Sequence, residues 1–382
     1  MKKILILMGR YLPGYKDGGP VRTIINLTEA LGDEYEFYIL TLDRDHGDIR
    51  PYDNIKYDEW LNVGKAKVQY VKPKGFTFKL IRKLISECDL VYTCGFYDDY
   101  GYKTLMLKQF KKVYGKPVVV ASMGSFSKGA LSQKSLKKKI FINTFKFLGL
   151  FNNIVWSVTS ELEANDLKKT IGTKAMYIVA EDLPRSVVPG RSTNSKVENS
   201  LNVVFLSRIS PKKNLIGAIK ILTKVSANIK FTICGPDEDK EYFKECKYAL
   251  PSLPSNVKWE YKGNILSDEV QVELAQHDVF LFPTLGENYG HVIFEALSVG
   301  CIPVISDTTP WKDLDSSGCG FVLSLDDLSA FSALLDKLAN MDSDDFSKYS
   351  LNAVNYATEK TKNAVLNTGY RNIFDLAGKE DL

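Results

Sequence analysis

Two positively charged side chains, Arg208 and Lys213, lie in the stretch FLSRISPKKN at residues 205–214. A buried strand is predicted over residues 201–206, so both cations fall in the loop that leaves its carboxyl end. Ligands of parallel sheets bind at such strand ends. A guanidinium can hold a phosphate through two hydrogen bonds, and an ammonium adds a point charge. Solvated surface charge is the ordinary explanation of these side chains, but their position favours a phosphate site.

A second stretch, PTLGENYGHVIFEALSVG at residues 283–300, places Glu287 before an apolar run and Glu295 inside it. A strand is predicted before this stretch, and a helix is predicted to begin near His291. The backbone N–H groups of residues 288–291 would then attract anions. The two carboxylates suit the hydroxyls of one elongated ligand, a sugar at one end and a ribose at the other. The alternative is a helix cap for Glu287 and a solvated position for Glu295.

Two further strand ends carry glycine. The loop GRYLPGYKDGGPVRT at residues 9–23 contains Gly18 and Gly19 ahead of a proline, and ICGPDED at residues 233–239 places Gly235 directly after a strand. Glycine lets a backbone approach a ligand closely, although a surface loop or a tight turn explains both stretches equally well. Neither stretch is G-x-G-x-x-G, which disfavours an enzyme that transfers hydride.

Strands and helices must alternate along the chain to position these loops. Predicted strands cover residues 4–8, 37–42, 68–71, 90–94, 118–123 and 155–159, then 201–206, 229–234, 257–261, 279–282 and 302–306. Predicted helices lie between several of them, and the tail from about residue 328 reads as three helical pieces. This alternation indicates an α/β fold with parallel, doubly wound sheets.

The alternation stops at residues 184–200, where Pro, Ser, Asn and charged residues are typical of a linker. We therefore expect two Rossmann-like domains that face each other across a ligand cleft. Residues 1–183 form the first domain and residues 201–360 the second. Residues 361–382 are expected to form a C-terminal helix that packs back on the first domain.

The combination of these stretches resembles the retaining GT-B glycosyltransferases of family 4. Glu287 and Glu295 form their E-x7-E motif, followed by the run EALSVGCIPV, and LSRISPKKN is similar to their R-x4-K diphosphate clamp. DGGPVRTI resembles their glycine-rich first loop, and VTSELEANDLKK the last helix-entry segment of their first domain. SDTTPW is similar to a bacterial subgroup that makes surface polysaccharides. The resemblance covers nearly the whole chain and implies the GT-B architecture.

The resemblance implies a role for each position. Arg208 and Lys213 would hold the diphosphate of a nucleotide-sugar and stabilise the leaving nucleoside diphosphate, and Glu287 would contact the donor sugar. These three residues are the predicted catalytic set. Glu295 would bind the ribose hydroxyls. The remaining predicted substrate-binding positions are Gly18, Gly19, Gly235, Gly263, Asn264, Ile265, Asn288, Tyr289, Gly290 and His291.

One departure from the family concerns the acceptor side. Many relatives carry a His in the first domain near the reacting carbon, whereas here ASMGSFSKGAL at residues 121–131 has none. Residues 122–127 would line that pocket, but no replacement for the His is identifiable. A second departure, YIVAEDLP in place of an N-G turn, affects only local turn geometry.

No metal or other cofactor is expected, because side chains and a helix N-terminus neutralise the phosphates in this family. The acidic stretches DRD at residues 43–45 and DED at residues 237–239 are interpreted as surface-loop acids. His46 and His277 are interpreted as structural, whereas His291 could touch phosphate or sugar.

Composition limits the remaining possibilities. The 382 residues suit two domains, and a net charge of +4 gives no indication of a nucleic-acid partner. Six cysteines without a C-x-x-C pair indicate a reducing compartment and no structural zinc. The apolar run at residues 4–8 is too short for a signal peptide, and no stretch is long enough to span a membrane. We expect a cytoplasmic location.

One segment suggests peripheral membrane contact. SLKKKIFINTFKFLGLF, Ser135–Phe151, combines apolar residues at helical spacing with four lysines. Such a basic, aromatic helix can lie on an anionic membrane surface. An ordinary core-facing helix with a solvated lysine face is the alternative.

The predicted reaction moves a hexosyl group from a nucleotide-sugar to a hydroxyl of a glycan or lipid-linked acceptor, with retention, in bacterial polysaccharide biosynthesis. A UDP-sugar is the first expectation and a GDP-sugar the second, although no residue decides between them. Another GT-B nucleotide-sugar or sugar-phosphate enzyme is an alternative, and so is a non-catalytic protein that binds nucleotide-sugars. Product analysis with and without an acceptor separates the first, and slow donor hydrolysis would argue against the second.

Overall fold

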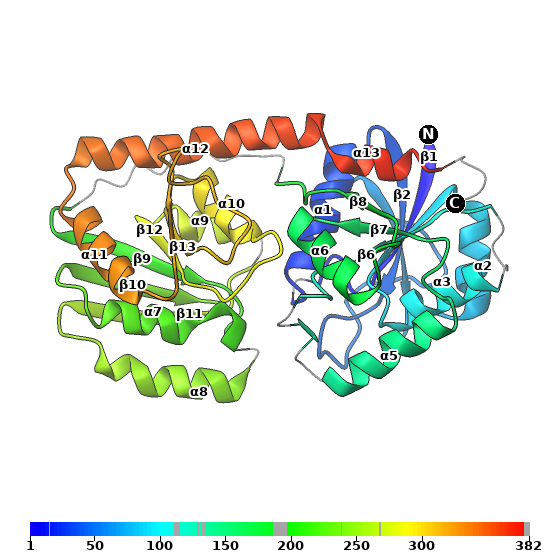
Figure 1. Cartoon of the computed structure of the whole chain (residues 1–382), viewed down its shortest axis with the longest axis horizontal. Helices are drawn as coiled ribbons and strands as arrows, with labels where there is room; N and C mark the ends of the chain where they lie inside the picture. Colours follow the sequence, from blue (N-terminus) through cyan, green and yellow to red (C-terminus); the bar gives the residue numbers. More distant parts are fainter. Residues whose placement is uncertain are drawn as a thin grey trace. The chain divides into compact units, whose positions relative to one another are not determined.

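The computed structural model describes residues 1–14, 16–110, 115–127, 130–131, 135–185, 197–237, 239–266 and 269–377 (Figure 1). The chain divides into two compact units. Unit 1 contains Met1–Ser186 and Asn363–Leu382, and unit 2 contains Val187–Lys362. Most of the predicted linker, residues 186–196, lies outside the described residues.

Unit 1 contains an eight-stranded sheet in the order β3-β4-β2-β1-β5-β6-β7-β8, parallel except where β3 meets β4. Its strands are β1 (Lys2–Leu7), β2 (Tyr35–Leu42), β3 (Leu61–Val63), β4 (Ala66–Val71), β5 (Leu90–Cys94), β6 (Val118–Ala121), β7 (Val155–Val158) and β8 (Tyr177–Val179). The apolar, β-branched runs bury both faces, as a parallel sheet requires.

Helices cover both faces of this sheet (Figure 1). One face carries α1 (Gly19–Leu31) and α13 (Gly369–Phe374). The other carries α2 (Phe78–Glu87), α3 (Asp99–Gln109), α5 (Ser135–Phe147) and α6 (Glu161–Thr170). This two-sided arrangement is the doubly wound fold that the sequence predicted.

Unit 2 contains a six-stranded parallel sheet in the order β11-β10-β9-β12-β13-β14. Its strands are β9 (Ser200–Leu206), β10 (Asn228–Cys234), β11 (Val257–Gly263), β12 (Val279–Phe282), β13 (Ile302–Ser306) and β14 (Phe321–Leu323). Its helices are α7 (Leu215–Leu222), α8 (Lys240–Ala249), α9 (Val270–Leu274), α10 (His291–Ser298), α11 (Leu328–Ala339) and α12 (Ser343–Leu366), with short 3-10 turns η1 (Pro211–Lys213) and η2 (Leu250–Ser252).

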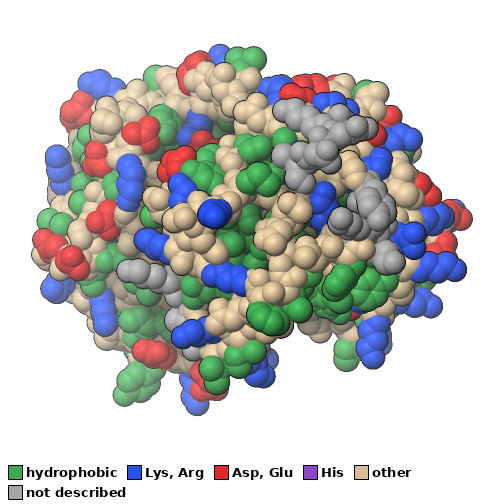
Figure 2. All heavy atoms as spheres, turned by 45° about the vertical axis from the view of Figure 1, so that its right-hand side comes forward, with side chains coloured by type: hydrophobic (Ala, Val, Ile, Leu, Met, Phe, Trp, Pro, Cys, Tyr) green, Lys and Arg blue, Asp and Glu red, His purple; other side chains and the backbone are tan. Residues whose placement is uncertain are grey.

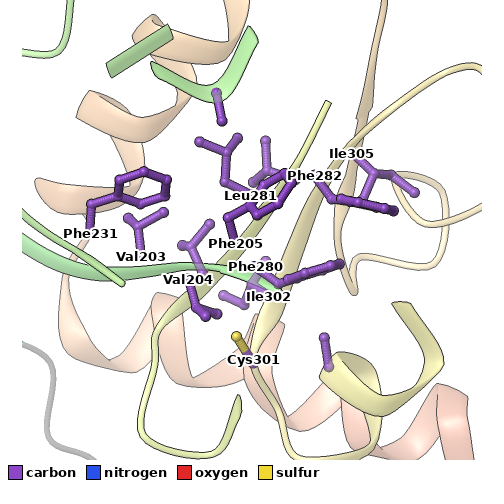
Figure 3. Close-up of a cluster of buried hydrophobic side chains, with 14 of the residues drawn as sticks. Val203, Val204, Phe205, Phe231, Phe280, Leu281, Phe282, Cys301, Ile302 and Ile305 are labelled. Atoms are coloured by element: carbon purple, nitrogen blue, oxygen red, sulfur yellow. The ribbon is translucent and has the colours of Figure 1, made fainter. Parts of the chain in front are cut away.

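The core of unit 2 is one continuous cluster centred on its middle strands. Figure 3 shows Phe205 of β9, Phe280 and Phe282 of β12 and Ile302 of β13 gathered in this core. Each of these four side chains is fully buried. The five strands predicted for the second half are therefore confirmed, while β14 was missed because its three half-buried residues form too short a run.

The predicted strand at residues 118–123 ends earlier than expected, at Ala121. Met123 and Gly124 have left-handed backbones with φ of 48° and 71°, which cannot continue a strand. The N–H of Gly124 donates to the buried Glu163 carboxylate (2.6 Å), which also accepts from the N–H of Thr159 (2.7 Å). Glu163 therefore fixes the turn within residues 122–127.

The last helix returns to unit 1. Helix α12 crosses the boundary between the units at residues 362 and 363, and α13 then packs on β2. The Phe374 ring meets those of Tyr35 and Phe37 at centroid distances of 5.0 and 5.7 Å. Arg371 binds Glu34 through its Nη2 (2.6 Å), and this guanidinium lowers the pKa of the Glu34 carboxyl.

We expect Phe374→Ala to destabilise unit 1, because Phe374 is fully buried between four aromatic rings. The free energy of unfolding in urea should fall by about 3–5 kcal/mol. The control Leu366→Ala removes a side chain that is 71% exposed and should change it by about 0.5 kcal/mol or less. Equal effects of the two substitutions would show that α13 is not part of the folded core.

Candidate functional site

The loop after β9 is organised by one asparagine. Asn214 has a left-handed backbone (φ 61°) between η1 and α7. Its side-chain oxygen accepts a hydrogen bond from the N–H of Gly217 (3.1 Å), which caps α7. Its side-chain nitrogen donates to the carbonyl of Pro283 (2.8 Å), the first residue after β12. Asn214 thereby starts a helix and joins the β9 loop to the β12 loop.

Further hydrogen bonds hold the β12 loop on two sides. The carbonyl of Lys212 accepts from the N–H of Leu285 (2.8 Å) and the hydroxyl of Thr284 (3.0 Å). The carbonyl of Thr284 accepts from the hydroxyls of Ser306 (2.6 Å) and Thr308 (2.7 Å). Ser306 and Thr308 belong to the SDTTPW stretch after β13. That stretch therefore serves as a support for the β12 loop.

The N-terminus of α10 is also held in place, through the contact between Tyr289 and Trp311. It follows Gly290, which is left-handed (φ 83°), and no described side chain caps it. Tyr289 is buried, its carbonyl accepts from Trp311 Nε1 (2.5 Å), and the two rings meet edge to face at 5.3 Å. The ring of His291 lies 4.8 Å from that of Tyr289. Tyr289 is therefore a packing residue, while Asn288, Gly290 and His291 keep partial exposure at an N-terminus suited to anions.

Lys213 and Glu287 form an ion pair between the two loops. Only 13% of the Lys213 side chain and 10% of the Glu287 side chain are exposed. The Lys213 ammonium also lies 5.6 Å from the ring centroid of Phe282. A charge at this depth is costly without a partner, so each side chain keeps the other in place. Two of the three predicted catalytic residues are therefore in direct contact.

Lys212 is a third cation at this place, and the sequence analysis missed it. Burial lowers the pKa of its ammonium; Glu287 opposes the shift, and the charges of Lys213 and Arg208 add to it. Among the described residues, no acidic side chain forms an ion pair with Lys212. Arg208, which is half-buried, thus belongs to the same group of charges. The adjacent lysines looked like ordinary surface charge, and only their place in a strand-end loop could have indicated Lys212.

Glu295 lies inside α10 and is only 4% exposed. This burial excludes the solvated position that was its alternative explanation. A buried carboxylate is costly without partners, and Glu295 is not without a partner in the structure. The acid is therefore an integral part of the helix.

Gly235 has a packing role in the structure. Its φ is 135°, and an added Cβ would lie 1.8 Å from the carbonyl oxygen of Ser207. Its N–H donates to the carbonyl of Gly263 (2.7 Å), and its carbonyl accepts from the Tyr261 hydroxyl (2.9 Å). Glycine here lets the β10 turn pass against the loop that carries Arg208, as the tight-turn explanation requires.

The predicted base pocket follows β11, on the far side of β10 from β9. Gly263 has a φ of 75° with open space where a Cβ would stand, Asn264 is exposed, and Ile265 packs on the core. Two strand spacings separate β11 from β9, a distance of about 10 Å. This separation suits a ligand that extends along the sheet edge.

Gly18 and Gly19 belong to unit 1, at the start of α1. Gly18 has a φ of 61° and precedes the first helical residue without a side-chain cap. A Cβ on Gly19 would meet no atom within 4 Å. The backbone is therefore accessible there, as close approach to a ligand needs.

The acids of the first acidic stretch are buried, so their interpretation as surface-loop acids was wrong. Asp43 accepts hydrogen bonds from Arg44 (2.8 Å) and the Tyr57 hydroxyl (2.7 Å), and Asp45 accepts from the N–H groups of Lys16 (3.1 Å) and His46 (2.8 Å). They organise the loop after β2. Within the described ranges, no group of three or more His, Cys, Asp or Glu is placed to hold a metal ion.

Comparison with known proteins identifies unit 2. Residues 191–360 match the family model "Glycosyl transferases group 1". This region contains the whole group of Arg208, Lys212, Lys213 and Glu287. Unit 2 therefore contains a group 1 glycosyltransferase domain, and the chain is a glycosyltransferase.

Two curated relatives show the range of sequence similarity. The chain is 23% identical over 268 residues to a GDP-mannose:cellobiosyl-diphosphopolyprenol alpha-mannosyltransferase of Xanthomonas oryzae pv. oryzae, covering 69% of this chain and 67% of that protein. It is 27% identical over 186 residues to a glycogen synthase of Clostridium kluyveri, covering 43% of this chain and 34% of that protein. Both similarities are low, so the substrates of these proteins are not assigned to this glycosyltransferase by identity alone.

Solved structures show that the glycosyltransferase shares its whole fold with others. Anabaena HepE, crystallised with UDP and glucose, superposes with a TM-score of 0.72 at 17% identity and covers 99% of this chain and 100% of its own. Sucrose-phosphate synthase from Thermosynechococcus elongatus gives a TM-score of 0.73 at 14% identity, and the match covers 98% of this chain and 100% of that chain. These similarities confirm the predicted GT-B fold of two Rossmann-like domains.

We expect Gly235→Ala to destabilise the glycosyltransferase and to reduce its turnover, because the new Cβ would strike the carbonyl oxygen of Ser207. The combined strain and clash should cost about 3 kcal/mol or more in urea unfolding. Gly263→Ala is the matched control: it is also left-handed but in open space, and should cost about 1–2 kcal/mol. If both variants lost the same free energy of unfolding, the close contact of residue 235 with the Ser207 carbonyl would not restrict that position.

Proposed function

We propose that this glycosyltransferase moves a hexosyl group from a nucleotide-sugar to a hydroxyl of a lipid-linked glycan, with retention of the anomeric configuration. The observation that carries the proposal is the group of three cations around Glu287 at the ends of β9 and β12. The lipid-linked acceptor is supported by the curated Xanthomonas relatives, whose names specify a diphosphopolyprenol acceptor. Polysaccharide biosynthesis is the process that such an acceptor suits.

The cations would hold the diphosphate. Arg208 and Lys213 keep the roles that the family resemblance implies, and Lys212 adds a third positive charge beside them. The N-terminus of α10 would contribute backbone N–H groups to the same anion. These charges need no metal ion to assist them, so we propose a metal-independent reaction.

The acids would recognise hydroxyl groups. Glu287 lies at the ion pair, where a donor sugar attached to the diphosphate would come within reach, and its carboxylate accepts hydrogen bonds only. Glu295, one helical turn into α10, would bind the ribose, and residues 263–265 would border the base. Sugar, diphosphate and nucleoside would then follow one another along the sheet edge.

The chemical step breaks the bond between the anomeric carbon and the diphosphate. The leaving oxygen keeps the bonding electrons, and the sugar acquires oxocarbenium character. The acceptor hydroxyl forms the new bond to the anomeric carbon and gives its proton to the departing diphosphate oxygen. Negative charge therefore grows on the diphosphate, opposite Arg208, Lys212 and Lys213. The protein's main contributions are positioning and stabilisation of that charge.

We propose GDP-mannose as the donor, because the two Xanthomonas relatives are both named for it. The sequence alone favoured a UDP-sugar, and no described residue distinguishes the two bases.

We expect GDP to raise the melting temperature of the protein more than UDP, ADP or dTDP at equal concentration, with EDTA present throughout. Stabilisation follows binding to the native state directly, and the cation group supplies the charge that a metal would otherwise provide. Transfer from GDP-mannose to a diphosphopolyprenol-linked glycan should then proceed in EDTA, and NMR of the product should show the α-anomer. A larger shift with UDP would overturn the choice of donor, and activity lost in EDTA would overturn metal independence.

We expect Lys213→Ala to lower kcat by a factor on the order of 100 or more, the effect of losing one preorganised charge contact. The substitution also leaves Glu287 buried without its cation, so the melting temperature must be measured in parallel. Lys220→Ala on α7 is the control, since Lys220 is exposed. A folded Lys213→Ala variant with near wild-type kcat would contradict the proposed catalytic role of Lys213.

A further inference from the structure

Three ionisable side chains of unit 2 meet beside β11, outside the cation group around Glu287. Lys262 of β11 binds the carboxylate of Glu273 in α9 at 2.7 Å, and Nε2 of His277 lies 3.0 Å from the same carboxylate oxygen. The exposed fractions of these side chains are 32%, 10% and 5%. Figure 2 shows Lys, Arg, Asp and Glu side chains mixed on the protein surface, where charged residues usually lie. The group around Glu273 differs, because most of it is buried.

The Glu273 carboxylate accepts both hydrogen bonds. Burial alone would raise its pKa, but the hydrogen bonds from His277 and Lys262 outweigh burial and lower the pKa. Burial also lowers the pKa of His277, and Glu273 opposes that shift. An ionised carboxylate only accepts hydrogen bonds, so Nε2 of His277 carries a proton. Glu273 is therefore held from two sides, by β11 and by the turn that follows α9.

The other ring nitrogen of His277 has no such contact. Nδ1 is buried, and no residue in the described part of the chain is its hydrogen-bond partner. An unmatched polar atom in the interior costs free energy, and an apolar side chain would fill this place without that cost. Packing therefore does not account for a histidine here. What histidine adds at this position is the hydrogen bond to Glu273.

The opposite side of α9 contacts α10. Gln271 donates from Nε2 to the hydroxyl of Ser298 (3.0 Å), and this hydroxyl donates to the carbonyl of Glu295 (2.8 Å). All three residues are buried. Because each residue of an α-helix turns by about 100°, Gln271 and Glu273 point to nearly opposite sides of α9. One helix thus contacts both β11 and α10.

The two elements that α9 joins are those proposed to hold the nucleoside. Residues 263–265 follow Lys262 directly, and Glu295 is the carboxylate proposed for the ribose. Helix α9 contains only the five residues Val270–Leu274, so it has little stability of its own. Contacts with neighbouring elements must fix its position, and Gln271 and Glu273 supply polar ones. The spacing between the base loop and the ribose acid therefore depends on α9.

We propose that Glu273 and Gln271 are positioning residues for the nucleoside half of the donor. Neither side chain would touch the ligand. Glu273 holds the end of β11 through Lys262, and Gln271 holds the turn of α10 that carries Glu295. The motifs on which the family resemblance depends contain neither residue. The inference rests on the proposed function, because it requires a nucleoside to bind along this sheet edge.

The test is isothermal titration of the full chain with GDP, with UDP and with inorganic diphosphate. Inorganic diphosphate needs only the cation group, whereas a nucleoside diphosphate also needs the nucleoside site. Glu273→Gln removes the charge that Lys262 and His277 meet. It should weaken binding of the preferred nucleoside diphosphate by about tenfold or more, the effect of losing a hydrogen bond to a charged group. Its affinity for inorganic diphosphate should equal that of the wild type, a difference that general destabilisation would not produce.

The kinetic expectation follows from the same argument. Contacts with the nucleoside are equal in the ground state and the transition state, so KM for the donor should rise by the same factor while kcat stays within about twofold. Lys213→Ala, in contrast, should lower kcat. The two substitutions therefore have opposite kinetic effects.

A second variant and a control complete the experiment. Gln271→Leu removes the hydrogen bond to Ser298 without a change of charge, and it should also weaken only the nucleoside diphosphate. It decides the question if Glu273→Gln does not fold, as shown by its melting temperature. The control Glu260→Gln makes the same substitution in β11, where Glu260 lies 3.9 Å from Lys230 in an exposed pair. Neither affinity should change in the control.

The outcomes separate this inference from the proposed function. A wild-type protein that binds neither GDP nor UDP would contradict the proposed function itself. If the wild type binds one of them and the folded variants bind it equally well, only the positioning role is overturned. Equal weakening of nucleoside diphosphate and inorganic diphosphate would also overturn that role.

Discussion

The ion pair between Lys213 and Glu287 depends on the order of the strands in the second sheet. From β9 the chain proceeds to β10 and β11 on one side, and then returns to β12 and β13 on the other. The loops after β9 and β12 therefore leave neighbouring strands at the same edge, where the chain reverses its direction across the sheet. Residues 74 positions apart in the sequence come into contact for this reason. The pair could not form in a sheet whose strands followed one another in sequence order.

The loops that carry the pair are held mainly through their own carbonyl groups. Asn214 binds the carbonyl of Pro283, Ser306 and Thr308 bind that of Thr284, and Trp311 binds that of Tyr289. Each contact gives a hydrogen-bond donor to a backbone carbonyl. In a partly buried loop, a carbonyl without a donor would cost free energy. Side chains around the site thus fix the backbone, and the backbone fixes the charges. A site built in this way has little freedom to misplace Lys213 when a ligand arrives.

Much of the fold followed from the sequence because parallel strands produce continuous apolar runs. The five predicted strands of unit 2 and the three helical pieces of the tail required no knowledge of packing. The early end of β6 did require it, since the left-handed backbone of Met123 is set by the contact of Glu163 with the next residue. Asp43 and Asp45 were misjudged for a similar reason. An acid in a loop looks exposed until hydrogen-bond donors from other segments are known to reach it.

The site was predictable in its motifs but not in its contacts. Spacing placed Arg208, Lys213 and Glu287 at strand ends, yet it could not show that Lys213 touches Glu287 or that Lys212 joins them. Gly235 illustrates the same limit, because a glycine after a strand fits either a ligand or a turn. Only the position of the Ser207 carbonyl gives it a packing role. Pairwise contacts across a sheet depend on strand order, which local pattern does not encode.

The balance of charge around Glu287 bears on how the proposed reaction would be driven. Three cations lie around one carboxylate, and Lys213 and Glu287 neutralise each other. The pKa of Lys212 is lowered first by burial, and the nearby charges of Lys213 and Arg208 add a repulsion that lowers it further. A diphosphate would relieve it, and would relieve it further as the sugar departs and negative charge accumulates on the leaving oxygen. Attraction that grows along the reaction lowers the barrier rather than only tightening binding. Glu287 is essential to this arrangement, because it holds Lys213 in position without cancelling the charge of its neighbours.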